Sequence, residues 1–170
     1  MFSAFYHMYN FKNIALCFVM LVFSLLGDAT LCSAANAPGF LLPSVTDTSI
    51  VDARDYRGKI VLVNFWATSC RPCRLEIPAL MRLQEQFGPQ GFSVIGISMD
   101  RSMSRVSNFV ERKQINYPVV MGDSKVAKDF GGIFGVPVSF LFDRAGNLIQ
   151  SYPGLVDHKV FERDINALMH

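Results

Sequence analysis

The stretch "GKIVLVNFWATSCRPCRLEIPAL", residues 58–80, joins an apolar run to two cysteines and then to a helical pattern. Residues 59–68 contain a continuous apolar, β-branched run, which is typical of a strand buried on both faces of a sheet. After the cysteines, apolar residues recur at helical spacing until the glycine and proline of "FGPQG" end the pattern; they are Leu75, Leu80, Leu83 and Phe87. The stretch therefore predicts a central strand, a short loop carrying the cysteines, and a helix.

The rest of the chain continues this alternation of strands and helices. The pattern predicts a buried strand over 91–99, an amphipathic helix over 104–114, a short strand over 117–121, a helical turn over 124–130, a hairpin over 138–152 and a last helix over 158–169. Alternation followed by a hairpin and a helix indicates an α/β domain, with a mixed central sheet covered by helices on both faces.

The first 37 residues are typical of an export segment. The apolar run "IALCFVMLVFSLLG", residues 14–27, follows Lys12 and precedes a stretch of small residues, so we expect a signal peptide cleaved after Ala37. The alternative is membrane anchoring through residues 14–27, and a lipid on Cys32 is a third possibility. In each case the domain formed by residues 38–170 lies outside the cytoplasm, either periplasmic or anchored facing outward, where disulfides persist.

The composition excludes one broad class of partner. The 170 residues include 16 Lys and Arg against 14 Asp and Glu, and the basic residues are scattered among the acidic ones. A nucleic-acid binder usually concentrates basic residues on one face or along one helix. We therefore expect no nucleic-acid partner, and the length favours a single domain.

Cysteine usage points to redox chemistry. Two of the four cysteines lie in the export segment, so the exported domain keeps only Cys70 and Cys73. A structural zinc site usually needs four Cys or His ligands, and this region adds only two histidines, so we expect no metal site. A disulfide that closes so short a loop removes little chain entropy, which makes a purely structural bridge a weak interpretation. The pair is best explained as a redox couple.

The predicted helix gives the two cysteines different roles. Cys70 lies at the helix N-terminus, where unpaired N–H groups and the helix dipole favour a thiolate, and Arg71 adds positive charge nearby. A thiolate is the form that attacks disulfides. We therefore predict that Cys70 attacks a partner and that Cys73 resolves the mixed disulfide.

The chain from about residue 38 onward resembles the extracytoplasmic thioredoxin-like proteins of the TlpA/ResA type. The resemblance depends on the opening stretch quoted above, with Glu76 and Pro78 after the cysteines, on "FLLP" at 40–43, on "GISMD" ending at Asp100, and on "FGVPVSFLFDRAGNLI" at 134–149. It implies a thioredoxin fold with an N-terminal extension and a central insertion around 103–130.

The same resemblance implies roles for residues around the cysteines. Pro137 corresponds to the cis-proline that faces the cysteines in these proteins, and Val136 would present its backbone to an extended substrate peptide. Trp66 joins them as a substrate-binding residue that also packs in the core at the rim of the site and shields the sulfur atoms. Glu76 and Asp100 are candidates for proton transfer, although Glu76 could be a solvated helix residue and Asp100 a cap of the next helix.

Three positions depart from the pattern of these proteins. Ser69 stands where relatives commonly have Trp, so an aromatic contact surface beside the nucleophile is missing. Asn64 stands where cytoplasmic thioredoxins have a buried acid, so the proton of Cys73 must pass to another group or to water. Val138 replaces a usual Thr, and we infer no consequence from it.

The resemblance implies a thiol-disulfide oxidoreductase that needs no cofactor. It favours reduction of disulfides in exported proteins, with recharging by a membrane electron donor and with the haem-site cysteines of apocytochrome c as a substrate class. Run backward, the same steps oxidise a substrate, so the direction of electron flow depends on the reduction potential of the pair against its surroundings. Two alternatives stay open: a peroxiredoxin-like peroxide reductase, and a copper carrier that uses the two cysteines as soft ligands.

Overall fold

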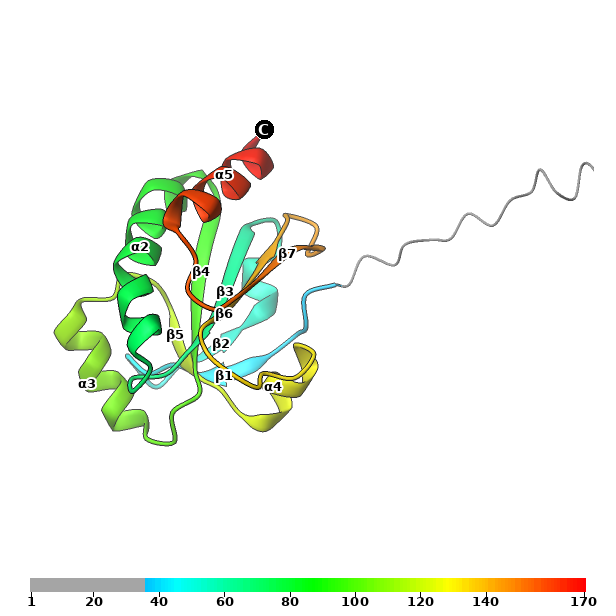
Figure 1. Ribbon diagram of the computed structural model, residues 1–170. Helices are drawn as coiled ribbons and strands as arrows, with labels where there is room; N and C mark the ends of the chain where they lie inside the picture. The colour runs from blue at the N-terminus through cyan, green and yellow to red at the C-terminus, as the bar shows by residue number, and fades with distance from the viewer. Residues whose placement is uncertain (1–35) are drawn as a thin grey trace, which may run out of the picture. The chain divides into compact units, whose positions relative to one another are not determined.

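The structure is a computed structural model that describes residues 36–170 (Figure 1). Its elements in chain order are β1 (Leu41–Pro43), β2 (Ile50–Asp52), the 3-10 helix η1 (Ala53–Tyr56), β3 (Ile60–Trp66), α2 (Arg71–Phe87), the 3-10 turn η2 (Gly88–Gln90), β4 (Phe92–Ser98), α3 (Met103–Lys113), β5 (Val119–Met121), α4 (Ser124–Asp129), β6 (Val138–Phe142), β7 (Leu148–Pro153) and α5 (His158–Met169). The predicted export segment lies, except for its last two residues, outside the described residues. No helix within residues 36–170 is long and apolar enough to cross a bilayer.

The central sheet has five strands in the order β5-β4-β3-β6-β7. Strands β3, β4 and β5 are parallel, whereas β6 is antiparallel to β3 and β7 is antiparallel to β6. All seven residues of β3 are buried, because this strand has neighbours on both edges and helices or loops over both faces. Its continuous apolar run is therefore explained by double-sided burial.

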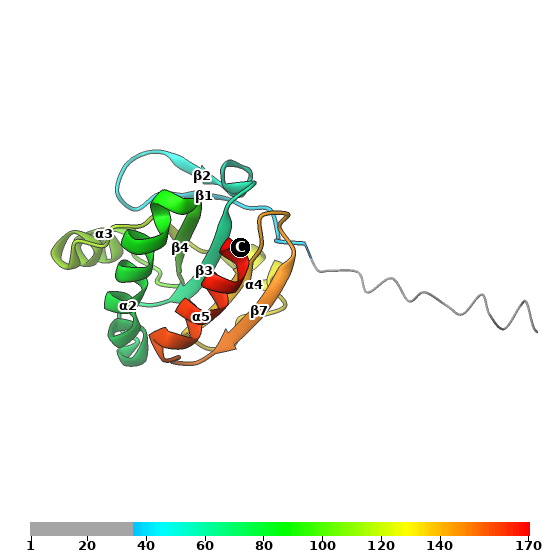
Figure 2. The same ribbon diagram turned by 90° about the horizontal axis from the view of Figure 1, so that it is seen from above.

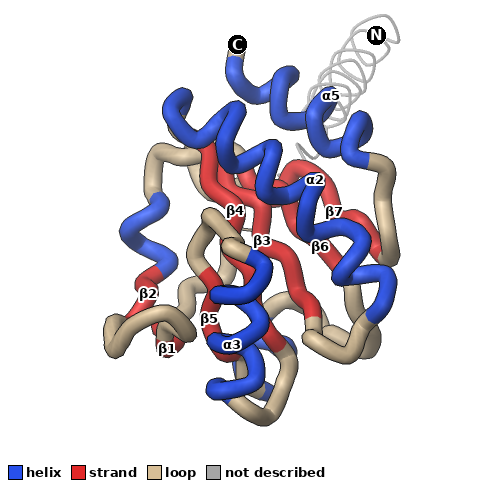
Figure 3. Tube along the Cα trace, turned by 90° about the vertical axis from the view of Figure 1, so that its left-hand side faces the viewer, coloured by secondary structure: helices blue, strands red, loops and turns tan. Residues whose placement is uncertain are grey.

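Helices cover both faces of the sheet. Figure 3 looks at the face covered by α2, α3 and α5, and α4 lies on the opposite side in Figure 1. The first face is filled by a cluster that includes Leu62, Leu80 and Phe161. The second is filled by Phe65 and Phe130, whose ring centroids are 5.0 Å apart, with the apolar residues around them. The predicted mixed sheet with helices on both faces is confirmed.

Helix α2 starts and ends where its sequence favours it. Cys70 is the N-cap residue, with extended backbone, and a proline follows in the first turn. The helix continues through Pro78, which is exposed. After η2, Gly91 adopts a left-handed conformation with φ 89°, which reverses the chain into β4 at little steric cost. This geometry fixes the cysteine loop at one end of α2 and the turn to β4 at the other.

The N-terminal region adds a small antiparallel sheet of β1 and β2, visible at one side of the molecule in Figure 2. It is attached to the central sheet through Val45, whose N–H donates to the Val119 carbonyl at 3.0 Å. The segment expected as a central insertion, 103–130, supplies α3, the edge strand β5 and α4. It therefore contributes to both faces and to one edge of the sheet.

Candidate active site

The two cysteines lie where β3 ends and α2 begins, and they form a disulfide with Cα atoms 5.3 Å apart. Cys70 is partly exposed, whereas Cys73 has only 1% of its surface exposed. The Cys73 N–H donates to Cys70 Sγ at 3.1 Å. This N–H lies in the first turn of α2, where backbone N–H groups have no partner within the helix, and it points at the sulfur of the more exposed cysteine. The outer sulfur can be reached by a partner, and the inner one cannot without movement.

The loop between β3 and the cysteines is held by a carboxylate. Asp100 accepts hydrogen bonds from the Thr68 N–H at 2.7 Å and from the Thr68 hydroxyl at 2.6 Å. The Ser98 hydroxyl donates to the same carboxylate at 2.9 Å. The side chain that caps α3 is Ser102, which accepts from the Arg105 N–H, so the interpretation of Asp100 as a helix cap is wrong. Asp100 instead ties the cysteine loop to the end of β4.

A backbone edge faces the outer sulfur. The Val136–Pro137 peptide bond is cis, as the resemblance implied, and the Val136 carbonyl oxygen lies 3.5 Å from Cys70 Sγ. Pro137 is buried, and its carbonyl accepts from the Gly154 N–H at 2.9 Å. Within residues 36–170 no hydrogen bond engages the Val136 N–H. An extended peptide could therefore pair with this edge beside the disulfide.

Glu76 is buried, with 1% of its surface exposed, so it is not a solvated helix residue. Its carboxyl group accepts from the Asn64 side-chain amide at 3.0 Å and from the Val156 N–H at 3.3 Å. The same amide also donates to the Ser139 hydroxyl at 2.9 Å. Burial raises the pKa of Glu76 to about 7, and these two hydrogen bonds to the carboxyl group lower it only in part. A group that titrates there can hold or release a proton at neutral pH.

Glu76 and Cys73 both lie on the buried side of α2, three residues apart. Residues at this spacing occupy the same face of a helix, one turn from each other. Asn64 comes from β3, the strand that ends beside the cysteine loop. The structure therefore brings Glu76 and Asn64 into contact, whereas the sequence analysis treated these two residues separately.

Trp66 does not lie where a partner could touch it. Only 1% of its surface is exposed, and its ring packs against Phe109 with centroids 5.4 Å apart. Gly96 leaves room for the ring, because a Cβ atom there would lie 3.2 Å from the indole nitrogen. The expectation that Trp66 binds substrate is therefore corrected: the residue belongs to the core beneath the site.

Arg71 is exposed at the first position of α2. Its guanidinium makes no hydrogen bond or ion pair within the described part of the chain. Arg74, one turn further on, lies with a guanidinium nitrogen 3.5 Å from the Thr68 carbonyl oxygen. Any influence of Arg71 on Cys70 acts through solvent-screened charge alone.

Sequence reasoning missed two residues of this site. Thr68 anchors the loop, and Ser139 completes the contacts of Asn64. In the sequence, both are polar residues inside or next to an otherwise apolar strand. In the structure, both side chains are buried. That signal marks a polar side chain in need of a partner but does not identify the partner.

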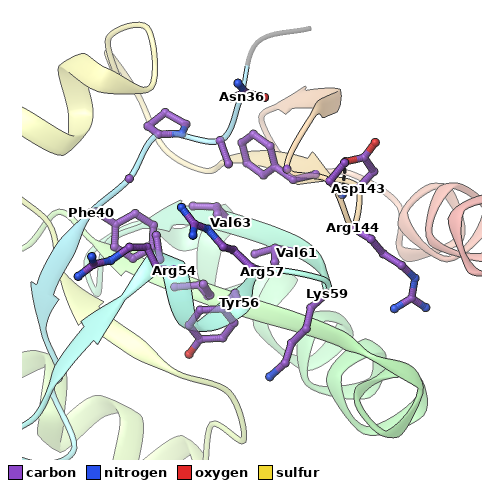
Figure 4. Close-up of a pocket in the computed structure, with 18 of the residues that line it drawn as sticks. Asn36, Phe40, Arg54, Tyr56, Arg57, Lys59, Val61, Val63, Asp143 and Arg144 are labelled. Carbon is purple, nitrogen blue, oxygen red and sulfur yellow. Dashed lines mark hydrogen bonds between the residues drawn. The ribbon is translucent and has the colours of Figure 1, made fainter.

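A separate cavity of about 330 Å³ lies away from the cysteines (Figure 4). Apolar side chains of Val61 and Val63 and basic side chains such as Arg57 and Lys59 line it. None of its lining residues is a cysteine or histidine, so it is not the redox site. Across residues 36–170, no group of three or more His, Cys, Asp or Glu side chains is arranged to hold a metal ion.

Comparison with known proteins places this site in a family. The AhpC/TSA family matches residues 34–151, which is more than half of the chain. The chain belongs to the AhpC/TSA family. The thiol-disulfide oxidoreductase ResA of Bacillus subtilis (strain 168) is 26% identical over 142 residues, covering 84% of this chain and 79% of that protein. ResA of Bacillus thuringiensis subsp. konkukian (strain 97-27) is 32% identical over 120 residues, covering 70% of this chain and 68% of that protein.

A solved structure agrees with these relatives. The crystal structure of a thiol:disulfide interchange protein of the thioredoxin family from Chlorobium tepidum TLS has a TM-score of 0.74 and 32% sequence identity, covering 79% of this chain and 96% of that one. The resemblance to ResA-type proteins and the thioredoxin fold are confirmed. The chain is a thioredoxin-like thiol-disulfide oxidoreductase.

Proposed function

We propose that this oxidoreductase acts outside the cytoplasm and reduces disulfides of exported proteins, with Cys70 as the nucleophile and Cys73 as the resolving cysteine. The observation that carries the proposal is the asymmetry of the pair. Cys70 is partly exposed, receives a helix N–H and faces the Val136 carbonyl, whereas Cys73 is buried one turn further into α2. A partner therefore meets Cys70 first.

In the first step the reduced protein attacks its partner. The Cys70 thiolate forms a bond to one sulfur of the partner's disulfide, that disulfide breaks, and the released partner thiolate takes up a proton from solvent. The Cys73 N–H stabilises the attacking thiolate, and the free Val136 backbone aligns the partner's chain beside it. The product is a mixed disulfide through Cys70.

In the second step Cys73 resolves the mixed disulfide. Its thiol gives up a proton and attacks Cys70 Sγ, the bond between the two cysteines forms, and the partner leaves as a second thiolate that is then protonated. Two electrons have moved from the cysteine pair to the partner. Glu76 is the proposed acceptor of the Cys73 proton, because its buried carboxyl group titrates at about pH 7 on the same face of α2.

The cellular setting is part of the proposal. Residues 1–37 are proposed to export the domain, as a cleaved signal peptide or as a membrane anchor, and a membrane electron donor would return the two electrons. The proposed substrate class is the reducible disulfide at the haem-attachment cysteines of apocytochrome c. The two thiols of such a site are close in sequence and form a disulfide in an oxidising compartment.

Replacing Cys73 by Ser tests the proposal directly. This variant keeps the attack but loses the internal nucleophile, so mixed disulfides with partners should accumulate and be released by dithiothreitol. Cys70→Ser is the matched control and should trap far less, because Cys73 is buried. Mass spectrometry of trapped proteins from the native host should recover apocytochromes c. Equal trapping by both variants, or by neither, would show that the roles are assigned wrongly.

A parallel assay separates the peroxide-reductase alternative. The purified, reduced wild-type protein is mixed with hydrogen peroxide or with oxidised insulin, and loss of its two thiols is followed in both cases. The proposed function predicts fast oxidation by insulin and slow oxidation by peroxide. Rapid turnover of peroxide in the absence of any protein disulfide would contradict it.

A further inference from the structure

Phe134 is the most exposed large apolar side chain among the described residues, with 99% of its surface exposed. It lies in a loop of glycines between α4 and β6. Gly131 and Gly132 have φ values of 87° and 90°, and Gly135 follows. A Cβ atom on Gly132 would lie 2.9 Å from the Phe134 ring, so the ring lies over bare backbone. An aromatic ring presented in this manner is an unpartnered contact surface.

The loop places this ring beside the redox pair. Phe134 is two residues before Val136, whose carbonyl oxygen is 3.5 Å from Cys70 Sγ, and two residues span about 7 Å of extended chain. Phe134, Val136 and Pro137 line one groove of about 380 Å³. Pro153 at the end of β7 and the following Gly154 also line the groove. Neither cysteine lines this groove, so the link between the ring and the reactive sulfur is the backbone from Phe134 to Val136, whose carbonyl faces Cys70.

The position of Phe134 complements the absence of an aromatic residue before Cys70. Ser69 occupies that position and is exposed, so the cysteine loop itself offers no broad apolar contact. Leu155, directly after the groove residue Gly154, is 50% exposed. On the Val136 side of the sulfur the exposed apolar side chain is Phe134, and on α2 it is Leu75, two residues after Cys73, with 62% of its surface exposed.

We propose that Phe134 anchors the partner polypeptide by receiving an apolar side chain about two residues from the partner's reacting cysteine. The proposal rests on the proposed function. The occupant follows from continuity: a chain that delivers its sulfur to Cys70, pairs with the Val136 backbone and continues along this loop reaches Phe134 within two residues. The patch is small, which suits a partner that must leave after exchange. The chain thus selects partners whose cysteine has an apolar neighbour.

The test compares two eight-residue peptides, each disulfide-linked to glutathione through one cysteine. One peptide carries Leu two positions before and after the cysteine, and the other carries Gly there. For the wild-type protein, kcat/KM should be about tenfold higher with the Leu peptide, chiefly through KM. Phe134→Ala should reduce this ratio to about one, whereas Phe134→Tyr should keep it.

Ile50→Ala is the matched control. Ile50 is an apolar residue of β2 with 57% of its surface exposed, and it does not line the groove. It should leave both kcat/KM values unchanged. A wild-type ratio near one, or a ratio unchanged in Phe134→Ala, overturns the proposal. A dimer that Phe134→Ala dissociates in sedimentation would also overturn it, since a second copy would then cover the ring. Turnover that survives Cys70→Ser would instead overturn the proposed function.

Discussion

At the scale of single residues, Glu76 is the side chain with the largest consequence for pH behaviour. A carboxylate with 1% of its surface exposed loses most of its hydration, and two hydrogen bonds replace only part of it. The ordinary pKa of 4.5 therefore rises to about 7 in the folded protein. In the unfolded chain the group is solvated and titrates at its ordinary value.

This difference predicts how stability depends on pH. Below pH 4.5 both states hold the proton, and Glu76 contributes no pH dependence. As pH rises from 4.5 to about 7, the unfolded chain releases the proton while the folded protein retains it, so wild-type stability falls by about 3 kcal/mol. Glu76→Gln should lack this fall. Urea unfolding of both proteins at several pH values between 4 and 8 measures the difference.

Glu85→Gln is the control for this prediction, since Glu85 is exposed on the same helix. Its stability should follow the wild-type curve across the same pH range. Parallel curves for wild type and Glu76→Gln would mean that the folded carboxyl group titrates near its ordinary value.

Residue-scale predictions from sequence were accurate for reactive groups and weaker for their surroundings. The spacing of the two cysteines after a buried strand identifies the pair, because that chemistry depends on local sequence. The environment of Glu76 depends on Asn64, twelve positions earlier on a different element, which no local pattern connects. Trp66 was partly misassigned, since the same apolar run that predicts a doubly buried strand also buries its last residue.

At the scale of elements, the position of the cysteine loop depends on the contact between β4 and the end of β3. Asp100 binds both the Thr68 amide and its hydroxyl, and it accepts from the Ser98 hydroxyl. This carboxylate has more than one partner, so its removal would leave donors unsatisfied close to the core. The loop that carries Cys70 is thus set by a contact between two strand ends.

We predict that Asp100→Ala lowers the free energy of unfolding by about 1–3 kcal/mol. It should also slow insulin-disulfide reduction, because Cys70 loses its fixed position at the start of α2. Asp100→Asn should retain part of both properties, since its side-chain oxygen can still accept from Thr68. Chemical unfolding and initial reduction rates measure the two effects.

Asp55→Ala, a change at an exposed carboxylate in η1, is the control and should alter neither property. A stable Asp100→Ala protein that reduces insulin at the wild-type rate would show that the loop holds its position without this contact.

Element bounds followed from the sequence where hydrophobic periodicity was uninterrupted. The last helix was predicted over 158–169 and is observed over the same residues, and the hairpin predicted over 138–152 contains β6 and all of β7 except Pro153. The glycine-rich loop that carries Phe134 has neither helical nor strand periodicity, so its ring could not be placed from sequence. Exposure there depends on how the loop leaves α4 and enters β6, which is a property of the assembled sheet.

At the scale of the whole molecule, the chain enters the domain far from its redox site. Asn36 bridges to Asn147, and the Ala37 N–H donates to the Gly146 carbonyl at 2.7 Å, both at the turn between β6 and β7. The cis peptide bond lies at the other end of β6, five residues away, which is about 17 Å of strand. Asn36 and Ala37 therefore lie at the end of β6 opposite to the cis peptide bond.

The last prediction is that the exported protein begins at Pro38. The apolar run of residues 14–27 is shorter than the roughly 20 residues of a spanning helix, and Ala37 satisfies the small-residue rule for cleavage. Among the described residues, cleavage after Ala37 removes the Asn36–Asn147 bridge with its Ala37 N–H hydrogen bond and none of the central sheet, so the fold can tolerate it. N-terminal sequencing and intact mass of the protein recovered from its native host measure the outcome. Ala37→Leu should block the cut, whereas full-length wild-type protein in the membrane fraction would show that residues 14–27 anchor the domain instead.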